Sequence, residues 1–272
     1  MKTTTITFIG GGNMARNLII GLIKSQYDSN YIWVTNRTPE KLVYFRDTVG
    51  IRTTGNNCEG AKFADVIVLA VEPAQIKMVC EEIKEVVKKR LPLLISVANG
   101  IRTELIKSWL DVDCPVVRAM PNTPASVQSG VTGLYAGLSV SVSEKDLAET
   151  IFHAVGLVVW LDTEELVNVV AALSGCGPAY VFLIMEALQE AGKKLGLPKE
   201  VARLLTLGTV QGAARMALES EEDVIQLRRF VTVPGGSTEQ AIKVFESRGI
   251  RELINHAVEA AYQHAEKVAK AV

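Results

Sequence analysis

The sequence predicts an α/β domain followed by an all-α domain. Short apolar runs rich in β-branched residues alternate with amphipathic helical segments from Thr3 to about Val159, which is typical of βαβ units and a parallel sheet. From about Thr163 onward the strand pattern stops and the apolar spacing is that of long helices. We therefore expect two domains, residues 1–162 and residues 163–272.

Seven apolar runs are the expected strands of the first domain. They span residues 5–10, 31–36, 66–71, 93–98, 115–120, 130–136 and 157–162. Residues 73–91 show helical spacing, with apolar Ile76, Val79 and Ile83 on one face. The expected helices of the second domain are Glu164–Leu173, Pro178–Lys194, Pro198–Ser220, Ser237–Ser247 and Gly249–Ala271.

The composition is that of a globular protein without a strongly charged surface. The chain has 272 residues, a formal net charge of -1 and 48% hydrophobic residues, which is enough for a sizeable core. Near-neutral charge without a basic block argues against nucleic acid or a membrane surface as a partner. We find no unbroken apolar run of about 20 residues, the length that a membrane-spanning helix needs.

The cysteines and histidines give no support for a metal site. Cys58, Cys80, Cys114 and Cys176 are scattered without a C-x-x-C pair, and the chain has three histidines without ligand spacing. Scattered thiols and the lack of a signal-peptide pattern favour the reducing cytoplasm.

One predicted helix is unusual in its residue types. The segment from Glu200 to Leu218 is apolar or small on nearly every face and includes Gly208 and Gly212. A helix that is apolar all round is buried, and small residues let a second helix approach closely. A domain of this size can hardly bury such a helix within one subunit. We therefore expect the helix to lie at a subunit interface, with a purely internal helix as the alternative.

The first expected strand leads into a glycine-rich turn and then a helix. Gly10-Gly11-Gly12-Asn13-Met14-Ala15 fits the G-x-G-x-x-A pattern of a Rossmann-type dinucleotide-binding domain. Gly10 permits the tight turn, Gly12 lets the backbone approach a pyrophosphate, and Ala15 keeps helix and strand close. The alternative is a glycine-rich turn that binds no ligand.

The end of the second strand indicates which dinucleotide is bound. NAD enzymes have Asp or Glu there to hold the ribose 2′-hydroxyl, whereas this chain has Asn36-Arg37-Thr38. No carboxylate repels a 2′-phosphate, and Arg37 could pair with one in a bidentate manner. We therefore expect NADPH, with NADH as a second candidate; the alternative for Arg37 is an ordinary surface charge.

Three further loops follow expected strands and should line the same crevice. Met120-Pro121-Asn122 would close its nicotinamide end, while plain turn chemistry is the alternative for each residue. The cofactor-binding residues predicted here, beyond residues 10–15 and 36–38, are Ile9, Asn57, Ala70, Val71, Glu72, Pro73, Val97, Ala98, Asn99, Met120, Pro121 and Asn122.

Several motifs together resemble one enzyme family over essentially the full length. They are "FIGGGNMA", "AVEP", "RAMPNTP", "LSGCGPAY" and "VTVPGGSTEQAI", and they resemble pyrroline-5-carboxylate reductase. The resemblance implies NAD(P)H-dependent reduction of the cyclic imine L-1-pyrroline-5-carboxylate to L-proline, the last step of proline biosynthesis. It also implies an active site completed across a homodimer, with dimers joined in a larger ring.

The resemblance assigns the substrate site to the second domain. It implies that Gly235, Gly236, Ser237 and the following helix hold the substrate carboxylate on backbone N–H groups, since a helix N-terminus attracts anions. It implies that Thr238, as the catalytic residue, hydrogen-bonds the ring nitrogen, and that Glu221 stabilises its protonated form. The alternatives are an N-cap role for Ser237 or Thr238 and a solvated charge for Glu221.

Three positions depart from the family pattern. Relatives usually have lysine where this chain has Glu72, serine where it has Val233, and serine where it has Cys176. Glu72 replaces a cation with an anion near the expected cofactor, and Val233 lacks a hydroxyl. The chemistry that the resemblance implies requires none of the three replaced groups.

Other functions remain open from the sequence. A β-hydroxyacid dehydrogenase-like enzyme would need a K-x-x-N pattern on the first long helix, and no asparagine follows Lys193 or Lys194 at that spacing. A non-catalytic NADP(H)-binding sensor would bind the cofactor without turnover. A reductase of a related six-membered cyclic imino acid would use the same residues.

Overall fold

The computed structural model describes residues 4–270, with side chains described as far as Lys267. The chain divides into two compact units. One consists of the residues up to Cys176 together with those from Ala261 onward, and the other of Gly177–Ala260. The α/β part and the all-α part expected from the sequence are confirmed.

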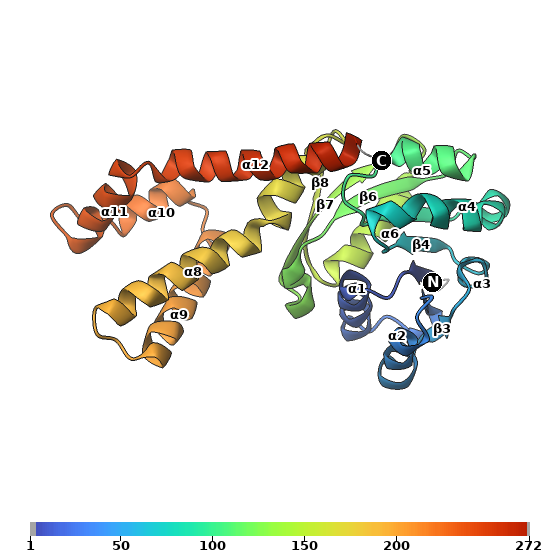
Figure 1. The fold of residues 1–272 in the computed structure, drawn as a ribbon, viewed down its shortest axis with the longest axis horizontal. Helices are drawn as coiled ribbons and strands as arrows, with labels where there is room; N and C mark the ends of the chain where they lie inside the picture. The colour runs from blue at the N-terminus through green and yellow to red at the C-terminus, as the bar shows by residue number, and fades with distance from the viewer. Residues whose placement is uncertain (1–3, 271–272) are drawn as a thin grey trace. The chain divides into compact units, whose positions relative to one another are not determined.

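The first unit is built on one eight-stranded sheet (Figure 1). The strand order is β3-β2-β1-β4-β5-β6-β7-β8, and every neighbouring pair is parallel except β6 and β7. The strands are β1 (Ile6–Ile9), β2 (Ile32–Thr35), β3 (Arg52–Thr54), β4 (Val66–Leu69), β5 (Leu93–Ser96), β6 (Val116–Met120), β7 (Gly130–Ala136) and β8 (Gly156–Trp160). The order reverses between β1 and β4, the place where such sheets bind ligands beyond the carboxyl ends of their strands.

Helices cover both faces of the sheet. Side chains from α1 and α6 pack in one apolar core, and side chains from α4 and α5 pack in the other. A sheet covered on both faces needs strands that are apolar throughout, and every residue of β1, β4 and β5 is buried. The helices of this unit are α1 (Asn13–Lys24), η1 (Ser29–Tyr31), α2 (Pro39–Val43), η2 (Tyr44–Val49), α3 (Asn57–Ala61), α4 (Pro73–Arg90), α5 (Thr103–Leu110), η3 (Thr123–Val127), α6 (Val142–His153), α7 (Leu166–Val170) and η4 (Ala171–Gly175).

The second unit is helical throughout its described residues. Its helices are α8 (Gly177–Lys194), α9 (Lys199–Glu219), α10 (Val224–Phe230), α11 (Ser237–Ser247) and the first part of α12 (Ile250–Lys270). The last turns of α12 belong to the first unit. Ala271, the expected last residue of this helix, lies outside the described residues.

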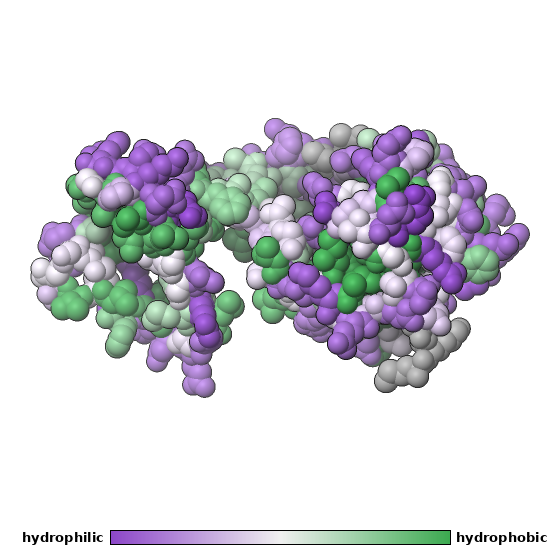
Figure 2. All heavy atoms as spheres, turned by 90° about the horizontal axis from the view of Figure 1, so that it is seen from below, coloured by the Kyte–Doolittle hydropathy of each residue, from purple (hydrophilic) through white to green (hydrophobic). Residues whose placement is uncertain are grey.

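The second unit has almost no core of its own. Among its described residues, Ala202 is the one apolar side chain that is buried. Phe182, Leu183, Leu204 and Leu205 are each more than half exposed, and apolar side chains gather on the surface of this unit in Figure 2. Exposed apolar area on this scale marks a surface that another molecule covers.

One stretch of helix passes the length and hydropathy test for a membrane span. Leu166–Lys194 reaches a mean hydropathy of 1.8 over its best window and is 22% buried there. Its apolar run is not unbroken, because Asn168 and Ser174 interrupt it. The test alone is weak, since helices that pack in or between soluble proteins pass it too.

The compact units divide the chain later than the expected boundary at 162/163. The reason is that α7 packs on the sheet: a Cβ atom at Gly133 of β7 would lie 2.9 Å from Val170 Cγ1. Asn168 of α7 also accepts a hydrogen bond from Arg118 of β6 at 2.7 Å. The expected two-domain division remains a prediction about functional parts of the chain.

Candidate functional site

The first two glycines of the turn after β1 are required by packing. Gly10 has φ +105°, which side chains rarely adopt, and a Cβ atom there would lie 2.4 Å from the carbonyl oxygen of Ala70. A Cβ atom at Gly11 would lie 3.0 Å from Phe45 Cε2. The turn therefore fits closely between β1, β4 and η2.

The third glycine faces open space. Gly12 is the N-cap of the 12-residue helix α1, with φ −77° and no side-chain cap, and a Cβ atom there would meet nothing within 4 Å. Asn13 and Met14 begin the helix, and Ala15 is fully buried against the core. An anion could approach the exposed N–H groups closely at this point, so the turn fits the pyrophosphate of a dinucleotide.

A cavity of about 350 Å³ lies next to this turn. Its cations are Arg37 and Lys41, and its lining contains no carboxylate. Lys41 and Gln75 are cavity residues that the sequence reading missed, although a lysine four positions after Arg37 was a usable signal. The lining residues are Ile9, Gly10, Thr35, Asn36, Arg37, Thr38, Lys41, Asn57, Val71, Gln75 and Val79.

Two asparagines shape the wall of this cavity. Asn36 Oδ1 accepts a hydrogen bond from the Thr38 backbone N–H at 2.9 Å, which closes the turn after β2. Asn57 Oδ1 accepts from the Thr35 hydroxyl at 2.5 Å, and Asn57 Nδ2 donates to Glu82 Oε2 at 2.8 Å. Both side chains are therefore fixed by the fold before any ligand arrives.

The loop after β4 places its acidic residue outside the cavity. Ala70 N–H donates to the Ile9 carbonyl at 2.8 Å, which ties this loop to the glycine turn. Glu72 is exposed as the N-cap of α4, Pro73 follows as its first residue, and neither lines the cavity. Glu72 stands where relatives usually have lysine, and because it lies outside the cavity it does not change the charge of the cavity itself.

The loop after β5 contains an open acceptor. Val97 N–H donates to the Leu69 carbonyl at 3.2 Å, and Ala98 N–H to Ser96 Oγ at 3.4 Å. Asn99 Oδ1 is buried and has no hydrogen-bond donor within the described part of the chain. A buried acceptor without a donor is unfavourable, so this oxygen fits a donor group on a bound ligand.

The loop after β6 meets the "LSGCGPAY" motif within the first unit. Asn122 Nδ2 donates to the Ser174 carbonyl at 3.0 Å, and Asn122 Oδ1 accepts from Val131 N–H at 2.9 Å. A Cβ atom at Gly175 would lie 2.9 Å from Met120 Cε. The side chain of Asn122 thus holds this loop in place, and Pro121 beside it is buried, whereas Met120 is partly exposed.

A buried arginine stands behind the same loop. Arg118 is 1% exposed; its Nη2 donates to Asn168 Oδ1 at 2.7 Å, and its Nη1 lies 3.7 Å from Glu164 Oε1. Burial lowers the pKa of Arg118, and the charge of Glu164 opposes this shift. Glu164 also accepts the Thr103 backbone N–H at 2.7 Å, so the cluster joins β6 to α5 and α7. The sequence reading did not identify it.

The second unit contains the Pro-Gly-Gly turn before α11. Gly235 has φ +76°, and Gly236 is the N-cap of α11. Both glycine N–H groups are occupied: Gly235 donates to Glu239 Oε2 at 3.0 Å and Gly236 to the Val233 carbonyl at 3.0 Å. These two N–H groups are therefore not open to a substrate carboxylate in this structure.

The next N–H groups of α11 remain open. Within the described residues no acceptor is recorded for the backbone N–H of Ser237 or Thr238. Neither side chain caps the helix, since the N-cap is Gly236 and no side-chain cap bond forms. The N-cap alternative for Ser237 and Thr238 is therefore wrong, and within the described residues the exposed Thr238 hydroxyl makes no hydrogen bond.

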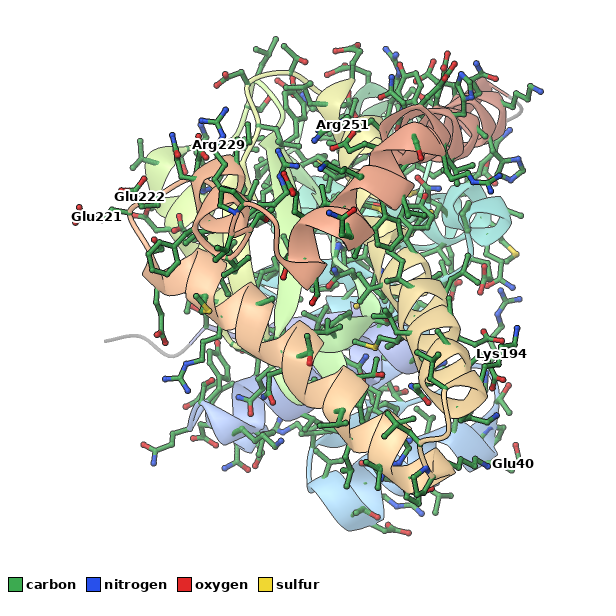
Figure 3. The ribbon with its side chains drawn as sticks, turned by 90° about the vertical axis from the view of Figure 1, so that its left-hand side faces the viewer. Glu40, Lys194, Glu221, Glu222, Arg229 and Arg251 are labelled. Atoms are coloured by element: carbon green, nitrogen blue, oxygen red, sulfur yellow. The ribbon has the colours of Figure 1, made fainter. Side chains whose placement is uncertain are left out.

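Glu221 lies apart from this turn within one chain. It stands on the exposed segment between α9 and α10 and projects outward beside Glu222 (Figure 3). Its neighbour Asp223 caps α10 by accepting the Gln226 N–H at 2.8 Å. No described contact joins Glu221 to Gly236, Ser237 or Thr238, so the structure does not bring these predicted site residues together.

The described residues hold no group of three His, Cys, Asp or Glu side chains that could bind a metal ion. The candidate site is thus a dinucleotide cradle in the first unit and a set of open N–H donors beside a hydroxyl in the second.

Two family models match separate parts of the chain. Residues 5–100 match the family model described as NADP oxidoreductase coenzyme F420-dependent, and residues 164–268 match the model described as pyrroline-5-carboxylate reductase dimerisation. The second match supports self-association of the chain.

Individual relatives match over nearly the whole chain. The pyrroline-5-carboxylate reductase of Pseudomonas aeruginosa is 42% identical over 270 residues, which cover 99% of this chain and 98% of the relative. A solved pyrroline-5-carboxylate reductase from Coxiella burnetii is 57% identical with a TM-score of 0.95, covering 98% and 99%. The Plasmodium falciparum pyrroline carboxylate reductase, solved with NADP bound, is 28% identical with a TM-score of 0.87, covering 99% of each chain. The chain belongs to the pyrroline-5-carboxylate reductase family.

Proposed function

We propose that this protein reduces L-1-pyrroline-5-carboxylate to L-proline with NADPH, as the last step of proline biosynthesis. One observation carries the proposal: the open N–H groups of Ser237 and Thr238 lie beside a Thr238 hydroxyl that the fold does not use. An anion site next to a hydroxyl suits a small substrate that has both a carboxylate and a ring nitrogen.

The first unit would hold the dinucleotide. We assign the pyrophosphate to the turn from Gly10 to Ala15, the 2′-phosphate end to Asn36, Arg37 and Thr38, and the nicotinamide end to residues 97–99 and 120–122. The open space at Gly12 and the carboxylate-free cavity support this assignment. When bound, the cofactor supplies the hydride.

The second unit would bind the imine. The backbone N–H groups of Ser237 and Thr238 hold its carboxylate, while Gly235 and Gly236 form the turn that exposes them. The Thr238 hydroxyl hydrogen-bonds the ring nitrogen and assists its protonation, and the carboxylate of Glu221 favours the resulting cation. Because Glu221 and Thr238 do not meet within one chain, we propose that two subunits complete one site.

We propose a homodimer, assembled into a larger ring, in the cytoplasm. The exposed apolar side chains of the second unit and the dimerisation match support a partner of the same kind. We assign the exposed apolar side chains of α8, within the stretch Leu166–Lys194, to packing against a second copy rather than to a membrane. Four free cysteines without a disulfide suit a reducing compartment.

The test follows oxidation of NADPH and of NADH by absorbance, with the five-membered imine and its six-membered analogue as substrates. Wild type should turn over the five-membered imine, and Thr238→Ala should lose about 100-fold in kcat, the low end for loss of an acid–base group. Thr238→Ser should restore most of the rate. Ser247→Ala, at the other end of α11, should behave as wild type.

Two other results of this assay would favour a different function. Cofactor binding without turnover of either imine would favour the non-catalytic sensor. Faster turnover of the six-membered imine would keep the chemistry and change the substrate. The dehydrogenase alternative has less support, since Lys193 is held by Glu190 at 2.7 Å.

A further inference from the structure

Two cations of the cavity beside β2 have no acidic partner. Within the described residues neither Arg37 nor Lys41 lies within 4.0 Å of a carboxylate oxygen. The recorded side-chain contact of Arg37 is with Met78 Sδ at 3.9 Å. Some other cations of this unit are paired, for example Lys88 with Asp111 at 2.9 Å. Two cations left without acids at one cavity leave positive charge that an anion would neutralise.

The backbone places these two side chains at the same cavity. Arg37 stands two residues after the end of β2, and Lys41 lies one turn later in α2, where its N–H donates to the Thr38 carbonyl at 3.2 Å. Both line the cavity together with the polar residues Asn36 and Thr38. Like charges held near one another repel, and a doubly charged phosphate between them removes that repulsion.

The rest of the lining suits a nucleoside. Val71 and Val79 offer apolar surface on the side of β4 and α4, and Gln75 offers one amide beside them. The volume of about 350 Å³ lies within the usual range of about 300–1,000 Å³ for small-ligand pockets.

We propose that Lys41 is a specificity-determining residue: with Arg37 it binds the 2′-phosphate of NADPH and so selects NADPH over NADH. This inference rests on the proposed NAD(P)H dependence and extends it beyond Arg37. The planar guanidinium of Arg37 can bind two phosphate oxygens, and the ammonium of Lys41 a third. A phosphate group carries a charge of about −1.5 to −2 at pH 7, which two cations would balance.

The experiment measures binding of 2′,5′-ADP and of 5′-AMP by calorimetry, without any imine. These probes differ only in the 2′-phosphate. Lys41→Gln should weaken 2′,5′-ADP binding by about tenfold, equivalent to about 1.4 kcal/mol, and change 5′-AMP binding by less than about twofold. Added salt should reduce the difference between wild type and variant, because both cations are exposed. Lys24→Gln removes the same charge at the far end of α1 and should bind both probes as wild type does.

Three outcomes would overturn the proposal. They are unchanged 2′,5′-ADP binding in Lys41→Gln, an equal loss for 5′-AMP, and an equal loss in Lys24→Gln. Retained 5′-AMP binding shows that the variant is folded. A protein that binds 2′,5′-ADP through Lys41 but does not reduce the imine would contradict the proposed function and leave this inference standing.

Discussion

Three consecutive glycines after β1 serve two different purposes. Gly10 and Gly11 are enclosed by the fold, with backbone or side-chain atoms where a Cβ atom would lie. Gly12 has ordinary backbone angles and nothing within 4 Å. Loss of the first should therefore affect stability, whereas loss of the third should affect what the turn binds.

Gly10→Ala and Gly12→Ala separate the two purposes. Gly10→Ala should lower the free energy of unfolding by more than about 2 kcal/mol, because it adds a clash to a strained φ. Gly12→Ala should lower it by about 0.5–1 kcal/mol, the usual effect of alanine at an N-cap, and weaken NADPH binding about tenfold or more. Urea unfolding and NADPH fluorescence titration measure the two effects. Wild-type NADPH affinity in Gly12→Ala would show that no ligand approaches this backbone.

Site residues that follow from a short sequence motif could be predicted, whereas residues that reach the site only through tertiary contacts were missed. The glycine turn follows from strand–turn–helix spacing, and Arg37 from the missing carboxylate after β2. Lys41 was missed although its position four residues after Arg37 was a usable signal, and the structure shows it lining the cavity. One of the two bonds that occupy the Asn122 side chain joins it to Ser174, 52 positions away, and no local pattern indicates such a pair.

Among the helices, α11 makes an unexpected contact: its Glu239 side chain binds the turn that precedes it. The carboxylate of Glu239, on the first turn of α11, accepts the Gly235 N–H at 3.0 Å and pairs with Lys243 at 3.2 Å. The Gly235 N–H, then Lys243, lower the pKa of Glu239. This contact closes the turn, and under the proposed function it would leave the N–H groups that follow for the substrate carboxylate.

Glu239→Ala should raise the KM for the imine severalfold with little change in kcat, because the turn loses its closing bond. Glu239→Gln keeps an acceptor and should stay near wild type. Gln240→Ala, at the next and exposed position, serves as the control in the same steady-state assay. A lower KM in Glu239→Ala would instead mean that this carboxylate repels the substrate.

The same contact predicts how the stability of this turn changes with pH. A carboxyl group whose pKa is lowered in the folded protein contributes stability above its ordinary pKa and loses it as pH falls through the lowered value. The closing bond of the turn should therefore persist at neutral pH and be lost only at a pH below the ordinary range of glutamate.

Among the elements that the sequence analysis did not predict, β3 and α10 have clear physical reasons. The strand β3 has three residues, none of them buried, so it shows no apolar run. The helix α10 has seven residues, none of them buried, so its spacing is hidden among charged neighbours. Pro198 is the N-cap of α9 instead of a first-turn residue. The long buried strands and the long helices were predicted correctly, since each repeats its pattern over enough residues.

At the scale of the whole molecule, the helical unit does not bury its own apolar side chains. Leu204 and Leu205 of α9 are 59% and 56% exposed, and Cβ atoms at Gly208 and Gly212 would meet nothing within 4 Å. Burial of such side chains contributes about 1.5–3 kcal/mol each. A second copy of the chain would supply that burial.

Leu205→Glu should therefore separate the subunits. Light scattering after gel filtration should show the mass falling from a multiple of 29.5 kDa toward 29.5 kDa, and imine turnover should fall with it if two subunits form each site. Lys24→Glu adds an acid at the exposed end of α1 and should leave the assembly intact. An unchanged mass in Leu205→Glu would place α9 outside the interface.

The last turns of α12 that the structure describes return to the first unit. Ala265 is 4% exposed there, and Glu266 accepts a hydrogen bond from Asn168 Nδ2 at 2.5 Å. The sheet unit is thus completed by residues that are translated after the whole helical unit. During synthesis on the ribosome, the contacts of Ala265 and Glu266 with this unit would therefore form only after the helical unit has been made.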